Sequence, residues 1–63
     1  MLTTLTDRER EVAQIAGTGA RTREIAELLR LSPRTVDVHL TRIYRKLDIN
    51  SRAALAHFMA QAG

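Results

Sequence analysis

Apolar residues recur along the chain at intervals of three or four, the spacing that places side chains on one face of an α-helix. They form three runs: Val12, Ile15 and Ala16; Ile25, Ala26, Leu28 and Leu29; and Val36, Leu40, Ile43 and Leu47. Gly17, Gly19 and Pro33 separate these runs, and the β-branched stretches typical of strands are absent. These three runs predict helices at about residues 7–16, 22–29 and 33–47, and the apolar segment after Ser51 predicts a fourth at about 51–60, so we expect an all-α fold of four helices.

The residues at the helix ends support these boundaries. Thr6 and Glu9 form the sequence signature of a capping box, and Ser32 followed by Pro33 is a typical helix start. The start of helix 22–29 has two interpretations: Thr22 is the N-cap, or Arg21 takes that place with Glu24 three residues later. Asp48 is expected to turn the chain after helix 33–47, because Asp tolerates left-handed geometry better than most residues.

The composition limits the kinds of site that the chain can hold. Its 63 residues are expected to form one small domain, 1–63, since a chain of this size buries only about 60% of its unfolded surface. With no cysteine and two histidines, we predict no metal and no cofactor. No apolar run approaches the length of a membrane span and the first residues do not resemble a signal peptide, so we expect a cytoplasmic protein without a membrane partner.

Positive charge is concentrated in the C-terminal two thirds of the chain. Residues 1–20 carry two basic and three acidic side chains, whereas residues 21–63 carry eight basic and four acidic ones. This asymmetry is compatible with a nucleic-acid partner, and it also fits the surface of soluble, arginine-rich helices.

Helix 33–47 has one face for a core and one face left free. At about 100° per residue, its apolar run occupies one narrow stripe. The opposite side carries Arg34, Val38, Thr41 and Arg45, flanked by Asp37 and Arg42. Such side chains suit the edges of DNA bases, because arginine bonds guanine, threonine donates or accepts, and valine contacts a thymine methyl group. The basic residues near the end of the helix, Arg42, Arg45 and Lys46, suit phosphates.

Helix 22–29, a short break and helix 33–47 form the pattern of a helix-turn-helix, whose second helix enters the major groove of DNA. From this pattern we predict DNA binding. Two alternatives stay open: a helical protein-interaction module that has lost DNA binding, which Asp37 favours, and a promoter reader like the last region of a sigma factor. We do not expect an enzyme, because Asp37 and His39, two residues apart on a helix, point in different directions.

Three segments, "LTDREREV", "EIAELLRLSPRTVDVHL" and "RIYRKLDINSRAALA", resemble the LuxR-type (LuxR/FixJ) helix-turn-helix domain of bacterial transcription regulators. The resemblance extends from Leu5 to about Ala56. It implies a four-helix fold and sequence-specific binding of double-stranded DNA for transcription regulation, with helix 33–47 in the major groove. It also implies a homodimer formed through the fourth helix. RNA polymerase is a further candidate partner, and such a protein is expected to be associated with the nucleoid.

The resemblance also assigns roles by position. The positions that match base contacts are Arg34, Asp37, Val38 and Thr41. The positions that match contacts to the DNA backbone are Thr22, Arg23, Thr35, Arg42 and Arg45, and Lys46 joins this set through its charge alone. The chain departs from the family where Lys is frequent (Asp37), where Ser-Asn is frequent (Arg21, Thr22) and where glycines are frequent (Arg30, Asp48).

Asp37 has two interpretations as a neighbour of Arg34. It holds the Arg34 side chain in a useful rotamer, or it accepts a hydrogen bond from a cytosine amino group. His39, at the margin of the core stripe of the same helix, is expected to be packed and hydrogen-bonded.

Helix 51–60 is apolar on more sides than one core contact requires. We expect Leu55, with Met59 or Phe58, to close the core. The surplus of small residues predicts a dimer interface, and the alternative is an alanine-rich helix without a partner. The predicted interface residues are Ala53, Ala56, His57 and Ala60.

Overall fold

The computed structural model describes residues 5–62 and confirms the all-α fold. Its helices are α1 (Asp7–Gly17), α2 (Thr22–Leu29), α3 (Pro33–Leu47) and α4 (Arg52–Ala62). The first helix ends one residue later than predicted, while the fourth begins one residue later and ends two residues later. Residues 5–62 contain no β-strand. None of the helices in this range combines the length and the hydrophobicity that a membrane span requires.

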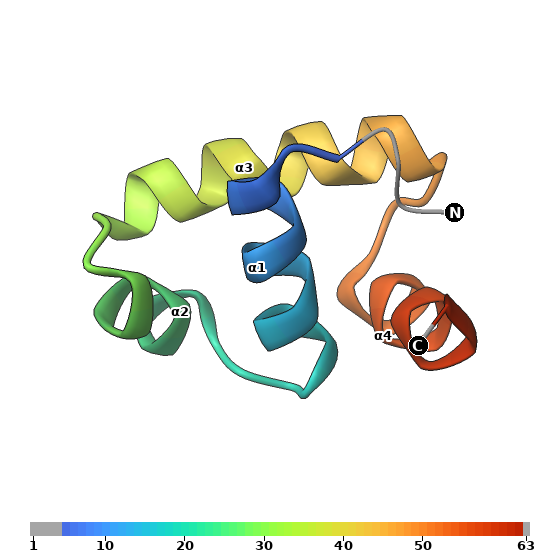
Figure 1. Ribbon diagram of the computed structural model, residues 1–63, viewed down its shortest axis with the longest axis horizontal. Helices are drawn as coiled ribbons and strands as arrows, with labels where there is room; N and C mark the ends of the chain where they lie inside the picture. Colours follow the sequence, from blue (N-terminus) through green and yellow to red (C-terminus); the bar gives the residue numbers. More distant parts are fainter. Residues whose placement is uncertain (1–4, 63) are drawn as a thin grey trace.

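The longest helix, α3, runs along one side of the molecule (Figure 1). Beneath its middle lies α1, with α2 on one side of α1 and α4 on the other. Because α1 packs against all three other helices, it forms the centre of the fold. α2 also packs directly against α3, as expected for the two helices of a helix-turn-helix.

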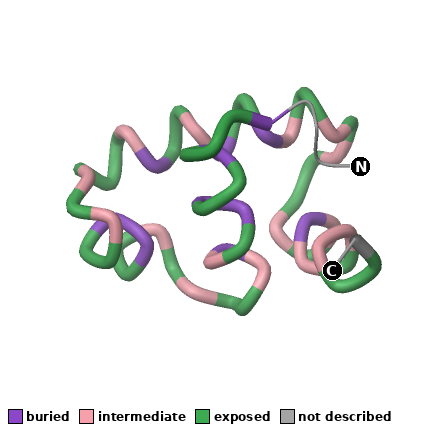
Figure 2. Tube along the Cα trace, in the orientation of Figure 1, coloured by how far each residue is buried: buried purple, intermediate pink, exposed green. Residues whose placement is uncertain are grey.

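The core collects apolar side chains from all four helices, and Figure 2 shows the buried positions on their inward sides. The buried apolar residues are Leu5, Val12, Ala13, Ala16, Ile25, Ala26, Val36, Leu40, Ile43 and Leu55. Met59, rather than Phe58, packs against this core together with Leu55. Leu55 is fully buried, and burial of such a side chain contributes about 1.5–3 kcal/mol, so α4 is an integral part of the fold.

Side-chain caps define the starts of α1 and α3 as predicted. Thr6 Oγ1 accepts a hydrogen bond from the Glu9 N–H at 3.1 Å, and Glu9 Oε1 accepts one from the Thr6 N–H at 2.9 Å. Both halves of the capping box are therefore present. At the start of α3, Ser32 Oγ accepts from the Thr35 N–H at 3.1 Å, and a proline occupies the first turn.

The start of α2 follows the second of its two interpretations. Arg21 is the N-cap residue, and Glu24 Oε1 accepts a hydrogen bond from the Arg21 N–H at 2.8 Å. Only this half of a capping box can form, because a guanidinium group has no acceptor. Thr22 is the first residue of the helix and not its cap. At α4, Ser51 Oγ caps the helix by accepting from the Ala54 N–H at 3.1 Å.

The chain leaves α2 and α3 through the same backbone conformation. Arg30 and Asp48 both have φ 57° and ψ 46°, in the left-handed region, which confirms the prediction for Asp48. After α2, the Leu31 N–H donates to the Ala26 carbonyl oxygen at 2.8 Å, and the corresponding bond closes the end of α3. This is the Schellman pattern of a helix end, and it makes the turn between α2 and α3 short.

Candidate nucleic-acid interface

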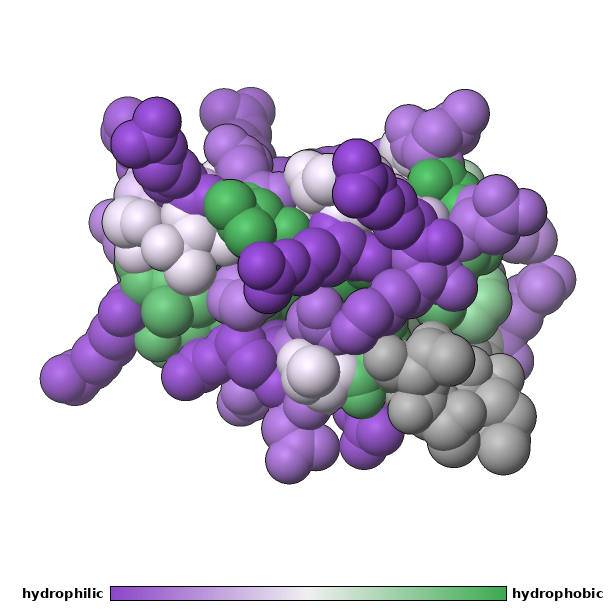
Figure 3. Space-filling view, turned by 90° about the horizontal axis from the view of Figure 1, so that it is seen from above, coloured by the Kyte–Doolittle hydropathy of each residue, from purple (hydrophilic) through white to green (hydrophobic). Residues whose placement is uncertain are grey.

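The long helix α3 turns one face to the core and the opposite face to solvent. Val36 and Ile43 are fully buried, whereas Val38, two residues from Val36, is 45% exposed. Figure 3 shows the side of the molecule on which α3 lies, and this side is mostly hydrophilic with small, separate hydrophobic areas. The free face predicted for this helix is therefore present.

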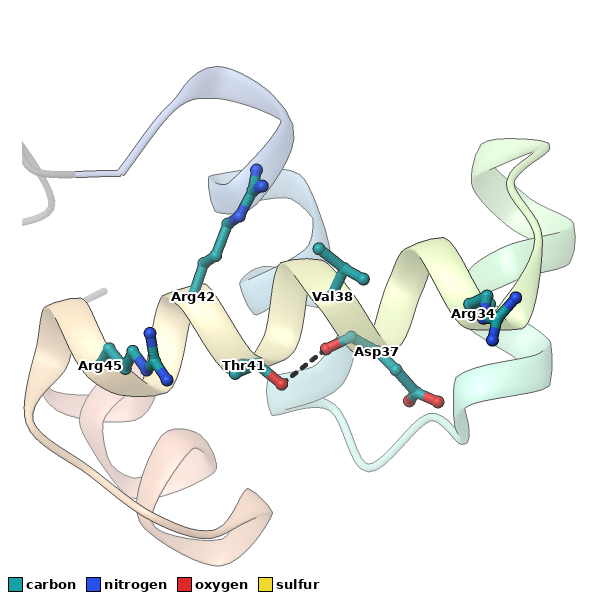
Figure 4. Close-up of a pocket in the computed structure, with 6 residues that line it drawn as sticks. All are labelled: Arg34, Asp37, Val38, Thr41, Arg42 and Arg45. Atoms are coloured by element: carbon teal, nitrogen blue, oxygen red, sulfur yellow. Dashed lines mark hydrogen bonds between the residues drawn. The ribbon is translucent and has the colours of Figure 1, made fainter.

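Six residues line a shallow, open surface on the outer side of α3, named here the α3 surface (Figure 4). They are Arg34, Asp37, Val38, Thr41, Arg42 and Arg45. The surface brings together all four residues predicted to contact bases and two of those predicted to contact the DNA backbone. Three arginines outnumber one aspartate, so its charge is positive. An open surface of this kind suits a macromolecular partner better than a small molecule, which proteins bind in concave pockets.

One side chain of the α3 surface is fixed by a hydrogen bond within the helix. Thr41 Oγ1 donates to the backbone carbonyl oxygen of Asp37 at 3.0 Å, one turn earlier (Figure 4). The hydroxyl proton of Thr41 is thereby engaged, and its lone pairs and methyl group stay available. Within residues 5–62 no ion pair joins the Asp37 carboxylate to Arg34, although the two lie one turn apart.

Two more of the residues predicted to contact the DNA backbone lie in the first turns of helices. Arg23 is exposed near the start of α2. Thr35 is half-buried near the start of α3, where its hydroxyl lies 2.9 Å from Ser32 Oγ. The first N–H groups of a helix lack intrahelical partners, and this position favours anions such as phosphate.

Thr22 is held by Arg52 of α4, a residue for which no role was predicted. The Arg52 guanidinium donates to Thr22 Oγ1 and to the backbone carbonyl oxygen of Ala20. It thus joins the start of α4 to the loop before α2 and to the first residue of that helix. A signal was available, because Arg52 is the one charged residue between Ser51 and Gly63.

Lys46 is engaged inside the fold. Its Nζ lies 2.6 Å from Glu9 Oε1, which belongs to the capping box of α1. Glu9 is 3% exposed, and the hydrogen bond from Lys46, followed by that from the Thr6 backbone, holds the pKa of its carboxyl below the ordinary value. This pair connects α1 to the last turn of α3, a structural role that was not predicted for Lys46.

The predicted interface residues of α4 are accessible. Ala53, His57 and Ala60 are exposed and Ala56 is half-buried. At about 100° per residue, the three exposed residues form one stripe on the side of α4 away from Leu55. Ala56 and Ala60 also border a shallow hollow between α1 and α4.

The expectation for His39 is wrong in one respect. The residue is half-buried as predicted, but its Nδ1 atom is buried and has no hydrogen-bond partner within the described residues. In the same range, no group of three or more His, Asp or Glu side chains is placed to hold a metal ion.

Residues 3–59 match the family described as bacterial regulatory proteins, luxR family. The chain belongs to the luxR family. The resemblance seen in the three sequence segments is therefore confirmed, and the helix-turn-helix formed by α2 and α3 is the LuxR type. The family is one of DNA-binding transcription regulators and not generally of enzymes.

Several curated proteins are similar to this luxR-family domain. The transcriptional regulatory protein UhpA of Salmonella typhimurium is 46% identical over 55 residues, which cover 87% of the chain and 28% of UhpA. The transcriptional regulatory protein TdiR of Thauera aromatica is 41% identical over 59 residues, covering 94% of the chain and 26% of TdiR. Mb0914c of Mycobacterium bovis, named as an HTH-type transcriptional regulator, is 42% identical over 59 residues, which cover 94% of the chain and 7% of Mb0914c. The chain thus spans less than a third of the length of each relative.

Proposed function

We propose that this luxR-family domain regulates transcription by binding duplex DNA sequence-specifically, with α3 in the major groove. Base edges are read by Arg34, Asp37, Val38 and Thr41. The observation that carries the proposal is the α3 surface, where these four side chains stand together and exposed on a helix anchored by its opposite face. Their mixture of donors, acceptors and methyl groups matches the variety of groups in the major groove.

Contacts to phosphates position the domain on the duplex. Arg42 and Arg45 flank the α3 surface and are exposed, and Arg23 and Thr35 stand at helix starts. Thr22 accepts from Arg52, so its own hydroxyl proton is available to a phosphate oxygen. Such contacts supply affinity and register without reading the sequence.

Lys46 has a smaller part in DNA binding than its charge suggests. Its ammonium group faces Glu9, and the pair is nearly neutral as a unit. Two of its three N–H donors are not needed for that bond and remain available for a phosphate.

The domain acts as a homodimer on two half-sites, with the contact formed by Ala53, Ala56, His57 and Ala60 of α4. Exposure of Ala53, His57 and Ala60 on the side away from Leu55 supports the dimer. Small residues let two helices approach closely, so that a modest stripe can still form an interface. RNA polymerase stays a predicted partner of the whole regulator.

Selection of bound sites from random duplexes tests the proposal most directly. We expect enrichment of one half-site motif, present twice when the protein is dimeric. The logarithm of the affinity should fall with the logarithm of the salt concentration, by roughly 0.9 per phosphate neutralised. A flat salt response, or no duplex binding at low salt, would instead favour a protein-interaction module.

The division between base and phosphate contacts is tested with two arginines of the α3 surface. Arg34→Ala should relax the preference at one base pair by about 1–3 kcal/mol, whereas Arg42→Ala should weaken binding to all sequences alike. Arg8→Ala, on α1, removes the same charge outside the α3 surface and serves as the control. Quantitative binding to the selected site and to single-base variants gives the comparison. Identical behaviour of the two variants would contradict the assignment.

A further inference from the structure

Asp37 and Thr41 offer two neighbouring hydrogen-bond acceptors on the α3 surface. The Thr41 hydroxyl uses its proton in the bond to the Asp37 backbone, so toward a partner it presents lone pairs. The Asp37 carboxylate is an acceptor as well. In Figure 4 the Thr41 hydroxyl and the Asp37 carboxylate extend to the same side of α3, and Arg42 extends to the other side.

The carboxylate of Asp37 is free to meet a partner. It is exposed, and within residues 5–62 no arginine or lysine forms an ion pair with it. Arg34 is therefore equally free to bond a base, and the two side chains act separately. Because residues three apart on a helix have Cβ atoms about 5–6 Å apart, their targets lie within one or two base pairs of each other.

A carboxylate can only accept hydrogen bonds, so Asp37 selects among the groups of the major groove. In the major groove, guanine offers only acceptors, and thymine offers an acceptor and a methyl group. Neither base can therefore donate a hydrogen bond to Asp37. Amino donors occur on cytosine and adenine. In adenine the amino group lies beside the N7 acceptor, which repels a carboxylate, whereas the amino group of cytosine has a C–H neighbour on its own ring.

We propose that Asp37 is a specificity-determining residue that accepts a hydrogen bond from the N4 amino group of a cytosine in the half-site. The guanine bonded by Arg34 lies within two base pairs of this cytosine. The inference rests on the proposed function and adds to it the identity of one base. It assigns to Asp37 a preference that a lysine at this position could not have, because lysine only donates.

Site selection with three proteins tests the inference: the unaltered chain, Asp37→Ala and Asp37→Asn. The unaltered chain should select a cytosine near an Arg34-dependent guanine. Asp37→Ala should lose the cytosine preference and keep the guanine. Asp37→Asn should exchange cytosine for adenine, because an amide pairs with both N6 and N7 of adenine. Glu27→Gln removes an exposed acid on α2, outside the α3 surface, and should leave the motif unchanged.

A single base change in the selected duplex gives the affinity measurement. Replacing the cytosine–guanine pair by uracil–adenine exchanges the amino donor of the pyrimidine for a carbonyl oxygen without adding a methyl group, and it moves the amino donor of the pair to the purine, beside the N7 acceptor. The unaltered chain should lose about tenfold in affinity, while Asp37→Ala should bind both duplexes almost equally. A cytosine preference that survives in Asp37→Ala, or specific sites without such a cytosine, would overturn the inference and leave the proposed function standing. Absence of any sequence preference in the unaltered chain would instead refute the proposed function.

Discussion

Arg30 occupies a backbone conformation that suits a smaller residue. Its φ of 57° lies in the left-handed region, where the Cβ atom crowds the following carbonyl group. The Schellman bonds at the end of α2 require this conformation, so the strain is tolerated for the tight turn into α3. The arginine side chain is exposed and forms no ion pair within residues 5–62, so it does not offset the strain.

Replacing Arg30 by glycine should therefore stabilise the domain. We expect Arg30→Gly to raise the free energy of unfolding by about 0.5–1 kcal/mol, since relief of strain exceeds the added chain entropy of the unfolded state. Urea denaturation gives the measurement. Arg30→Ala is the matched control, because alanine keeps the Cβ atom and should bring no gain. Equal stabilisation by both variants would mean that the arginine side chain, and not its backbone, is unfavourable.

We expect Asp37 to limit the attraction of the α3 surface to DNA in general. It is the one acid among three arginines there, and its charge is repelled by every phosphate that the domain approaches. A residue of this kind lowers non-specific affinity while it leaves room for specific contacts.

Asp37→Lys should consequently bind an unrelated duplex more tightly and discriminate less between sites. The new ammonium group adds about one phosphate contact, so the salt dependence should steepen by about 0.9 in the double-logarithmic plot. Titrations of a selected site and of an unrelated duplex at several salt concentrations would measure both effects. Weaker binding of the variant to every duplex would contradict this prediction.

At the scale of elements, Glu9 joins two helices through one buried carboxylate. Its oxygen accepts from the cap of α1 and from Lys46 in the last turn of α3. A buried carboxylate needs such partners, because an unpaired charge in the interior is unfavourable. The capping box is thus part of the packing of α3 as well as the start of α1.

The Glu9 contact predicts an acid-sensitive part of the stability. Folding lowers the pKa of Glu9, so its stabilising contribution is complete above the ordinary value of 4.5 and is lost as the pH falls through the folded-state pKa. Glu9→Gln should remove this part of the dependence. The free energy of unfolding, measured from pH 7 into the acid range, should fall less steeply with decreasing pH in the variant than in the unaltered chain. An equally steep fall in both proteins would contradict the prediction.

Lys46 and its neighbour Arg45 provide a matched comparison for the same contact. Lys46→Met should lower stability at neutral pH by about 1–2 kcal/mol, because it leaves the Glu9 carboxylate with one partner fewer. Arg45→Met, on the exposed α3 surface, should leave stability nearly unchanged. For DNA binding we expect the reverse, with Arg45→Met the more severe change. Equal loss of stability in both variants would show that the Glu9 contact contributes little.

At the scale of the whole molecule, the position of α4 decides which of its many apolar residues are free. Leu55 and Met59 face α1, and a Cβ atom placed on Gly17 would lie 3.2 Å from Met59 Cβ. The small size of Gly17 therefore lets α4 lie close against α1. The Ala53–His57–Ala60 stripe is left outside.

A charge placed on this stripe should prevent dimerisation. We expect Ala53→Glu and Ala60→Glu to remain monomeric and to bind an isolated half-site normally, because two like charges would face each other in a symmetric contact. Sedimentation without DNA and on duplexes with one or two half-sites would measure this. Leu28→Glu places the same charge on α2, where Leu28 is 67% exposed, and should leave dimerisation intact. A monomer produced by Leu28→Glu, and not by the α4 variants, would move the interface to α2.

The local sequence was sufficient for the helices and for the α3 surface. Apolar spacing and capping residues act within four or five positions, so they identified four helices and the free side of α3 in advance. The left-handed turn at Asp48 followed from the same local chemistry. The roles of the α3 surface in DNA binding stay predictions until binding is measured.

Contacts between distant residues were decided only by the tertiary structure. Arg52 bonds Thr22, 30 positions away, and Lys46 bonds Glu9, 37 positions away. No local periodicity encodes such pairs, because they depend on how α1 packs against α3 and on where α4 lies relative to the start of α2. The start of α2 was ambiguous in the sequence because Arg21 and Thr22 both fitted the N-cap, and the structure places Arg21 there with its N–H bonded to Glu24. Spacing along the chain thus determined the helices and their faces, while packing among the helices determined which polar side chains stabilise the fold and which stay free for DNA.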